Sequence, residues 1–97
     1  MEGIFFIKWV GAPTSIDVKG EQIAKLSIVI SNRLPRSGDN GVYNIDQDFC
    51  IDLLGERATG FTLHPNDWIT ASLSFTAKPS TNGGYFQDIR MNRYCKL

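Results

Sequence analysis

Alternation of apolar and polar residues with a period of two dominates this chain. The pattern is clearest over residues 22–31, where Ala24, Leu26, Ile28 and Ile30 share one face and mostly polar side chains share the other. Alternation of this kind predicts a half-buried β-strand.

Five segments fit a strand, either by this alternation or as a short apolar run bounded by turn residues. They are residues 4–10, 22–31, 45–54, 68–78 and 85–96. The first segment is apolar almost throughout, which indicates burial on both faces. In the third, Phe49, Ile51 and Leu53 point one way, and the opposite face carries Asp46, Asp48, Cys50 and Asp52.

The segments between the strands are polar or rich in turn residues. Residues 32–44 form the most polar stretch, and their prolines, glycines and asparagines predict a long loop. The one segment compatible with a helix is 55–63, and it is two turns long at most. His64-Pro65-Asn66-Asp67 predicts a turn.

The order of the elements is three strands, a short helix and two strands. Closure into a barrel removes the strand edges that a small sheet would otherwise expose. We therefore predict an all-β fold with a single domain over residues 1–97. Its architecture is a five-stranded closed Greek-key barrel of the OB type, with one short helix between the third and fourth strands. An SH3-like barrel is the main alternative, but its helix follows the fourth strand.

Composition narrows the function. Ten Lys and Arg balance ten Asp and Glu, so the formal net charge is zero. A neutral chain has no overall electrostatic field that attracts polyanions, which counts against tight general nucleic-acid binding but allows a local basic patch.

No signal peptide or membrane-spanning run is found, so we expect a cytoplasmic protein. Cys50 and Cys95 are expected to be free thiols. His64 has no partner at metal spacing, so neither a metal nor a cofactor is predicted.

Three segments of the second half carry a family resemblance: Asp48–Ala58, His64–Asp67 and Tyr85–Arg90. They resemble three parts of bacterial single-stranded DNA-binding proteins and of a small OB family related to them. The first segment is similar to that family's third strand running into a Gly-x-x-Ala helix start. The second is similar to the turn before the fourth strand, and the third is similar to the last strand. The resemblance implies an OB fold and binding of single strands by stacking bases on exposed aromatic side chains along a cationic groove.

The chain departs from this family at the binding positions. Asp48, Leu54 and Pro79 stand where the family usually carries base-stacking aromatics, and Asp46, Asp48 and Asp52 would repel phosphate. A binding surface on the second and third strands is therefore unfavourable. We expect the last strand and the loops to make the contacts instead.

A basic and aromatic cluster is expected on one face of the last strand, because Phe86, Arg90 and Tyr94 share its parity. Such a cluster suits phosphate contact and stacking. The full set of expected nucleic-acid contacts is Lys25, Arg33, Arg36, Lys78, Phe86, Arg90, Arg93 and Tyr94. A solvated charged face is the competing interpretation of the basic residues. For Trp9 and Phe86 we prefer packing in the core or in a subunit interface, and for Trp68 a place capping the barrel end against the helix.

No catalytic residues are expected, because no base is spaced to activate a serine or cysteine. Asp46, Asp48 and Asp52 are of the type that coordinates hard cations, but a solvated or cross-strand-paired acidic face is the preferred interpretation. The sequence thus predicts a non-enzymatic module of replication or repair that binds single-stranded DNA (or RNA). We expect a homodimer or higher homo-oligomer with no membrane and no small-molecule substrate. The alternative is an OB-type protein-interaction or assembly subunit that does not bind nucleic acid.

Overall fold

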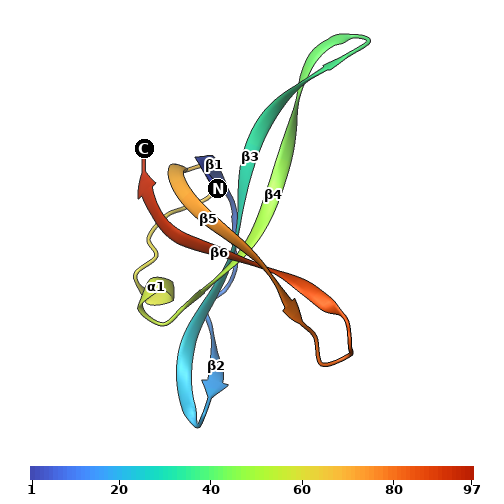
Figure 1. The fold of residues 1–97 in the computed structure, drawn as a ribbon. Coiled ribbons are helices and arrows are strands. Elements are labelled where there is room, and N and C mark those ends of the chain that lie inside the picture. The colour runs from blue at the N-terminus through green and yellow to red at the C-terminus, as the bar shows by residue number, and fades with distance from the viewer.

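The computed structural model describes the whole chain, residues 1–97, as six β-strands and one short helix (Figure 1). All strand pairs are antiparallel. The elements are β1 (Glu2–Val10), β2 (Thr14–Val18), β3 (Glu21–Gly38), β4 (Gly41–Leu54), α1 (Glu56–Thr59), β5 (Trp68–Pro79) and β6 (Tyr85–Lys96). The five predicted strands are all present, the predicted helix is a single turn, and β2 is a strand that the alternation did not reveal.

Strand β1 lies at the centre of the sheet and pairs with β3 on one side and β5 on the other. Strand β4 pairs with the far edge of β3, and β6 pairs with the far edge of β5. No backbone ladder joins β4 to β6, so both are edge strands of the sheet, as is the short β2, which pairs only with β3. The all-β architecture is as predicted, but hydrogen bonds do not close the barrel.

The sheet coils so that its inner face encloses one cluster of 12 buried apolar residues. Phe5 of β1 and Phe49 of β4 meet edge to face at 5.8 Å between ring centroids. The segment after β4 covers one end of this core with Ala58, Phe61 and Leu63. The inward faces predicted for the third strand are therefore confirmed, because Phe49, Ile51 and Leu53 are all buried.

The β3–β4 hairpin continues far beyond the core as an arm, which we define as residues 32–47 (Figure 1). The prediction of a loop over residues 32–44 is wrong, because the two strands remain paired up to the turn at Asp39-Asn40. Both faces of the arm are exposed to water, so no alternation of apolar and polar residues is needed there. Without that alternation the sequence has the composition of a loop. The radius of gyration is 15.8 Å, against about 12.5 Å for a compact domain of this length.

A bulge in β6 changes which way its side chains point. Leu73 pairs with Met91 and Ser72 pairs with Arg93, so Asn92 is one residue too many on β6. An extra residue in one strand reverses the parity of the side chains beyond it. Met91 is buried as its parity requires, but Tyr94 also turns inward and packs against the core. The expectation that Tyr94 shares a face with Phe86 and Arg90 is therefore wrong.

The core and the arm differ sharply in how much an apolar side chain contributes to the stability of the fold. Ile51 and Ile45 lie on the same strand with the same parity, but Ile51 is 1% exposed and Ile45 is 42% exposed. We expect Ile51→Ala to lower the free energy of unfolding by about 2–5 kcal/mol, the usual range for emptying a buried aliphatic site. Ile45→Ala should lower it by less than about 1 kcal/mol. Urea denaturation of both variants measures the difference, and equal losses would show that the arm is packed like the core.

Candidate nucleic-acid interface

The unpaired side of the coiled sheet, where β4 passes β6, is hollowed into a groove. The groove reaches from β2 and β3, across the outer side of β4 and α1, to the first half of β6. We call it the seam groove. The polar and aromatic residues that line it and carry the argument are Lys25, Asp52, Arg57, Phe86, Asp88 and Arg90.

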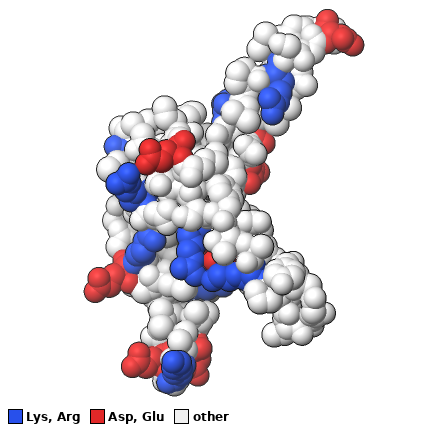
Figure 2. All heavy atoms as spheres, viewed as in Figure 1, with Lys and Arg blue, Asp and Glu red and all other residues white.

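Basic side chains converge on this groove from four elements. Lys25 comes from β3, Arg57 from α1 and Arg90 from β6, and Lys78 of β5 joins them through its 3.2 Å contact with Asp88. Figure 2 shows the matching band of Lys and Arg across the middle of the molecule. Against these four cations stand only the carboxylates of Asp52 and Asp88, which leaves a local charge of +2 in a chain with no net charge.

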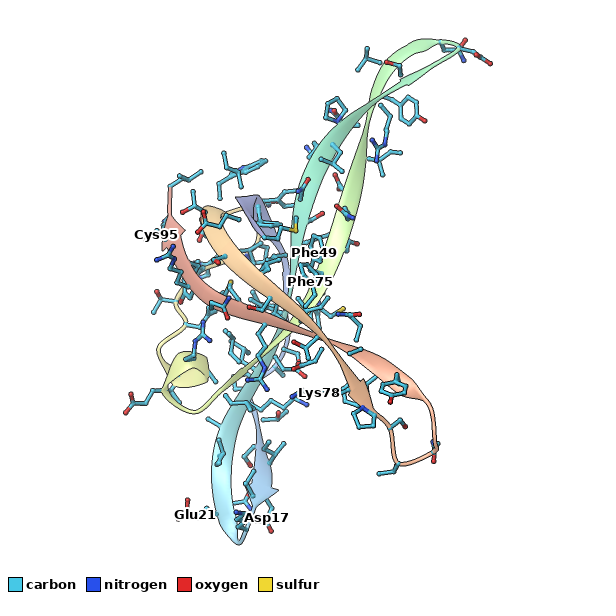
Figure 3. All side chains as sticks on the ribbon, in the orientation of Figure 1. Asp17, Glu21, Phe49, Phe75, Lys78 and Cys95 are labelled. Atoms are coloured by element: carbon cyan, nitrogen blue, oxygen red, sulfur yellow. The ribbon has the colours of Figure 1, made fainter.

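One aromatic side chain stands in the same groove. Phe86 is 52% exposed and lies directly across the β5–β6 ladder from Lys78, on the face of β6 that also carries Asp88 and Arg90. Figure 3 shows Lys78 out along this hairpin, away from the core residue Phe49. Phe86 is therefore not a core residue, and its ring is available for stacking beside cations.

Arg57 is the groove residue that the sequence analysis missed. Its guanidinium donates a hydrogen bond to the main-chain carbonyl of Met91, so it bridges α1 and β6 across the unpaired side. Gly55, with a φ of +64°, turns the chain out of β4 and starts the single helical turn that places Arg57 there. The only sequence signal was a basic residue just after a glycine that ends a strand.

The structure gathers Lys25, Lys78, Phe86 and Arg90 of the eight expected contact residues and leaves the other four elsewhere. Arg33 stacks over the ring of Phe6 at 5.1 Å and pairs with Asp46. Arg36 lies on the arm, across from Tyr43. Arg93, beyond the bulge, pairs with Glu2 at 3.0 Å, and Tyr94 packs inward against Phe61.

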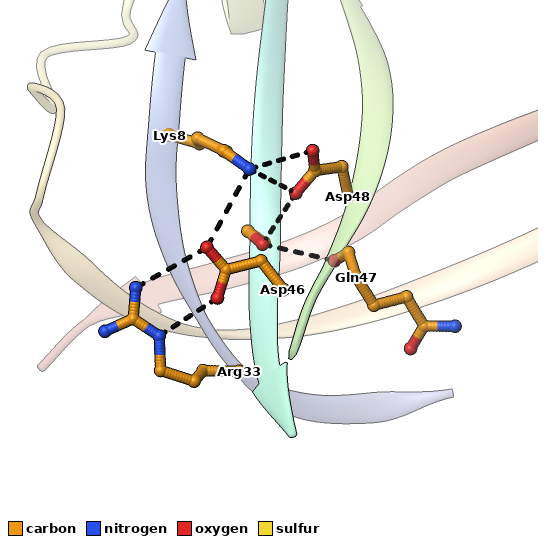
Figure 4. Close-up of polar contacts among 6 residues, drawn as sticks. Lys8, Arg33, Asp46, Gln47 and Asp48 are labelled. Carbon is orange, nitrogen blue, oxygen red and sulfur yellow. Dashed lines mark hydrogen bonds and ion pairs between the residues drawn. The ribbon is translucent and has the colours of Figure 1, made fainter. Parts of the chain in front are cut away.

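The aspartates on the acidic face of β4 form ion pairs and hydrogen bonds with residues of neighbouring strands (Figure 4). This is the cross-strand pairing that the sequence analysis preferred for them. Lys8 donates to both oxygens of Asp48 at 3.0 Å, and Ser31 donates to Asp48 at 2.8 Å. Arg33 donates to Asp46 at 2.9 Å. The hydrogen bond from Arg33 lowers the pKa of Asp46, and those from Lys8 and then Ser31 lower the pKa of Asp48. These carboxylates are engaged by neighbouring cations rather than gathered around a metal position.

Both tryptophans lie on the outer surface rather than in the core. Trp9 is 53% exposed and lies against Gly11, where an added Cβ would come within 2.7 Å of the indole. Trp68 packs on Phe6 at 5.3 Å between centroids, whereas α1 packs on β3 and β4. The place predicted for Trp68 against the helix is therefore wrong, and the core interpretation of Trp9 is wrong too.

The two cysteines, Cys50 in the seam groove and Cys95 on β6, are free and exposed. The single short helix is far from the length and hydrophobicity that a membrane-spanning helix requires.

Comparison with solved structures finds this fold in a protein that binds single-stranded DNA. One of the matching structures is a deletion mutant of the single-stranded DNA binding protein from Thermus aquaticus, with a TM-score of 0.63 over 100% of this chain and 15% sequence identity. The chain spans 50% of the length of that protein chain. A likeness at this identity shows a shared fold. No family model matches the sequence, and no curated protein matches it.

The lowered pKa values predict how stability depends on pH. A carboxyl group whose pKa is lower in the folded state than in the unfolded state stabilises the folded protein. This stabilisation is complete above the pKa of the unfolded state, and it is lost as the pH falls through the pKa of the folded state. For Asp48 the ordinary value is 3.8, so the loss begins near there and continues below it. We expect the urea midpoint to fall between about pH 4 and pH 2, and to fall less in Asp48→Asn.

The matched control for this experiment is Asp39→Asn, which removes a carboxyl at the arm turn that has no ion pair. It should keep the full wild-type dependence. An Asp48→Asn variant with an unchanged acid response would contradict the role of the Lys8 and Ser31 contacts.

Proposed function

We propose that this chain is a non-enzymatic module that binds single-stranded nucleic acid, DNA in the first place, in the seam groove. The observation that carries the proposal is the convergence of four cations and the exposed ring of Phe86 on one hollow, while the rest of the surface has no net excess of positive charge. Backbone phosphates need cations, and unpaired bases need an aromatic platform. The fold shared with a DNA-binding protein from Thermus aquaticus supports the same conclusion.

In this proposal Phe86 stacks on a base, while Arg90, Lys78, Lys25 and Arg57 contact the phosphates on either side of it. Single strands suit the site better than duplexes, because a duplex keeps its bases stacked within the helix and has no free base face for Phe86.

Four of the expected contact residues lie away from the seam groove. Arg36 has no ion-pair partner and extends along the arm, so we propose it as a peripheral phosphate contact. Arg33, Arg93 and Tyr94 are engaged by Asp46, Glu2 and Phe61 and are left out. A role in replication or repair and a cytoplasmic location remain predictions from the sequence.

Phe86→Ala tests the stacking contact. The variant should weaken binding of a labelled oligo-dT by roughly 5- to 150-fold, the equivalent of the usual contribution of one stacked base. Fluorescence anisotropy at low salt gives the dissociation constants.

The matched control is Tyr85→Ala, because Tyr85 is 75% exposed on the same strand but its parity turns it away from the face of Phe86. Its affinity should stay near that of the wild type. Equal losses in the two variants would place the stacking site elsewhere, and a wild-type chain that binds no oligo-dT would reject the function itself.

A second observation favours self-association and keeps the alternative of an assembly subunit open. The outer face of β1, β5 and β6 exposes apolar side chains in adjacent rows of the ladder, namely Ile4, Trp68, Cys95 and Leu97. At its edge lie the opposite charges of Glu2 and Arg93. An apolar centre with charges of both signs beside it is self-complementary about a two-fold axis. We therefore propose that this face binds a second copy of the chain.

Sedimentation equilibrium tests the second copy. Wild-type protein should show a concentration-dependent dimer, and Ile4→Glu should shift it to the monomer, because it places a charge at the centre of the apolar face. The control is Val42→Glu, which places the same charge on a more exposed residue of the arm. A wild-type chain that stays monomeric at high concentration would contradict the proposed dimer.

A further inference from the structure

The two cations of the β5–β6 hairpin in the seam groove are already occupied by a carboxylate of the chain itself. One oxygen of Asp88 accepts a hydrogen bond from Arg90 Nε at 3.0 Å and lies 3.2 Å from Lys78 Nζ. The hydrogen bonds, from Arg90 first and Lys78 second, also lower the pKa of Asp88, so it is ionised at neutral pH.

The strand geometry brings these three side chains together. Asp88 and Arg90 are two residues apart on β6 and therefore point to the same face. Lys78 is the partner of Phe86 on the neighbouring strand, which places it diagonally across from Asp88. Phe86 lies on this face too, so the stacking ring, the carboxylate and both cations form one row.

A carboxylate oxygen and a phosphate oxygen are equivalent acceptors for a guanidinium or an ammonium group. A phosphate can therefore reach Arg90 and Lys78 with full effect only by displacing Asp88 or by coming close to its negative charge. The ion pair between Asp52 and Lys25 is longer, with 3.8 Å between Oδ2 and Nζ. The other carboxylate oxygen of Asp52 accepts a hydrogen bond from Ser27 Oγ at 2.6 Å. Asp88 is thus the stronger competitor in the groove.

We propose that Asp88 is an intramolecular competitor of phosphate for Lys78 and Arg90, which weakens every complex that uses these two cations. This inference rests on the function proposed above. Any strand whose phosphates bind Lys78 and Arg90 must displace Asp88, so the competition acts on single strands and duplexes alike. A single strand also offers an unstacked base to Phe86, and this stacking offsets the displaced ion pair. A duplex has no such compensation, so with Asp88 in place it needs a higher concentration to bind than a single strand does.

Asp88→Asn tests the inference, with binding of oligo-dT and of a duplex of equal length compared by anisotropy. The variant should bind both oligo-dT and the duplex more tightly than the wild type, by up to roughly 5-fold and by a similar factor for each, because the phosphates of either ligand no longer have to displace Asp88. The salt dependence for the duplex should steepen by about 0.9 in log–log slope for each phosphate newly engaged.

Three controls separate competition from other effects. Asp39→Asn makes the same change of net charge at the arm turn, far along the hairpin from the groove, and should leave both affinities close to those of the wild type. Asp88→Asn in a Lys78→Gln, Arg90→Gln background should show no gain, because the cations that it frees are gone. Asp88→Ser provides a second substitution, and thermal melts of all variants establish that they fold.

The outcomes distinguish this inference from the function on which it rests. Weaker binding of both ligands by Asp88→Asn would mean that Asp88 positions its cations, and it would overturn the inference. A gain equal to that of Asp39→Asn, or a gain that survives loss of both cations, would overturn it as well. In each case a loss of oligo-dT binding in Phe86→Ala would leave the proposed function standing. If no variant binds either ligand, both fail.

Discussion

Strand β1 is the constraint on which the rest of the molecule depends. It is the one strand hydrogen-bonded to both β3 and β5, so it joins the two long hairpins along one side of the coiled sheet. On the other side β4 and β6 approach without a backbone ladder. They are held there by the shared core and by the hydrogen bond from Arg57 to the carbonyl of Met91. Side-chain burial, rather than a ladder, therefore keeps the two hairpins together.

The candidate site follows from this open side. A closed ladder would bring the backbones of β4 and β6 to within about 5 Å of each other, whereas here side chains from β3, α1, β5 and β6 share the space between them. Cations far apart in the sequence meet in one groove for this reason. The balance of charge there is then set locally, since Asp52 and Asp88 neutralise part of what Lys25, Lys78 and Arg90 supply.

Hydrophobic alternation, together with one apolar run, was enough to predict the five main strands, because burial against a core gives the sequence its period of two. The burial predicted for both faces of residues 4–10 is wrong, because Ile4 and Trp9 are 56% and 53% exposed. The arm was mistaken for a loop because neither of its faces is buried. The position of Tyr94 was mistaken because a single extra residue at Asn92 reverses the parity beyond it, and nothing in the residue types marks that bulge. Four of the expected contact residues did converge, whereas Arg57 depends on how α1 meets β6, which the sequence pattern does not show.

The central proposal is that single-stranded DNA binds on the unpaired side of the coiled sheet. The most direct measurement is a map of backbone amide chemical-shift changes in isotope-labelled protein titrated with oligo-dT. The account predicts that the largest changes cluster at residues 86–90 of β6, at Lys25 and at Arg57. Changes confined to the arm, or to the outer face around Ile4 and Trp68, would contradict it, and so would the absence of any change.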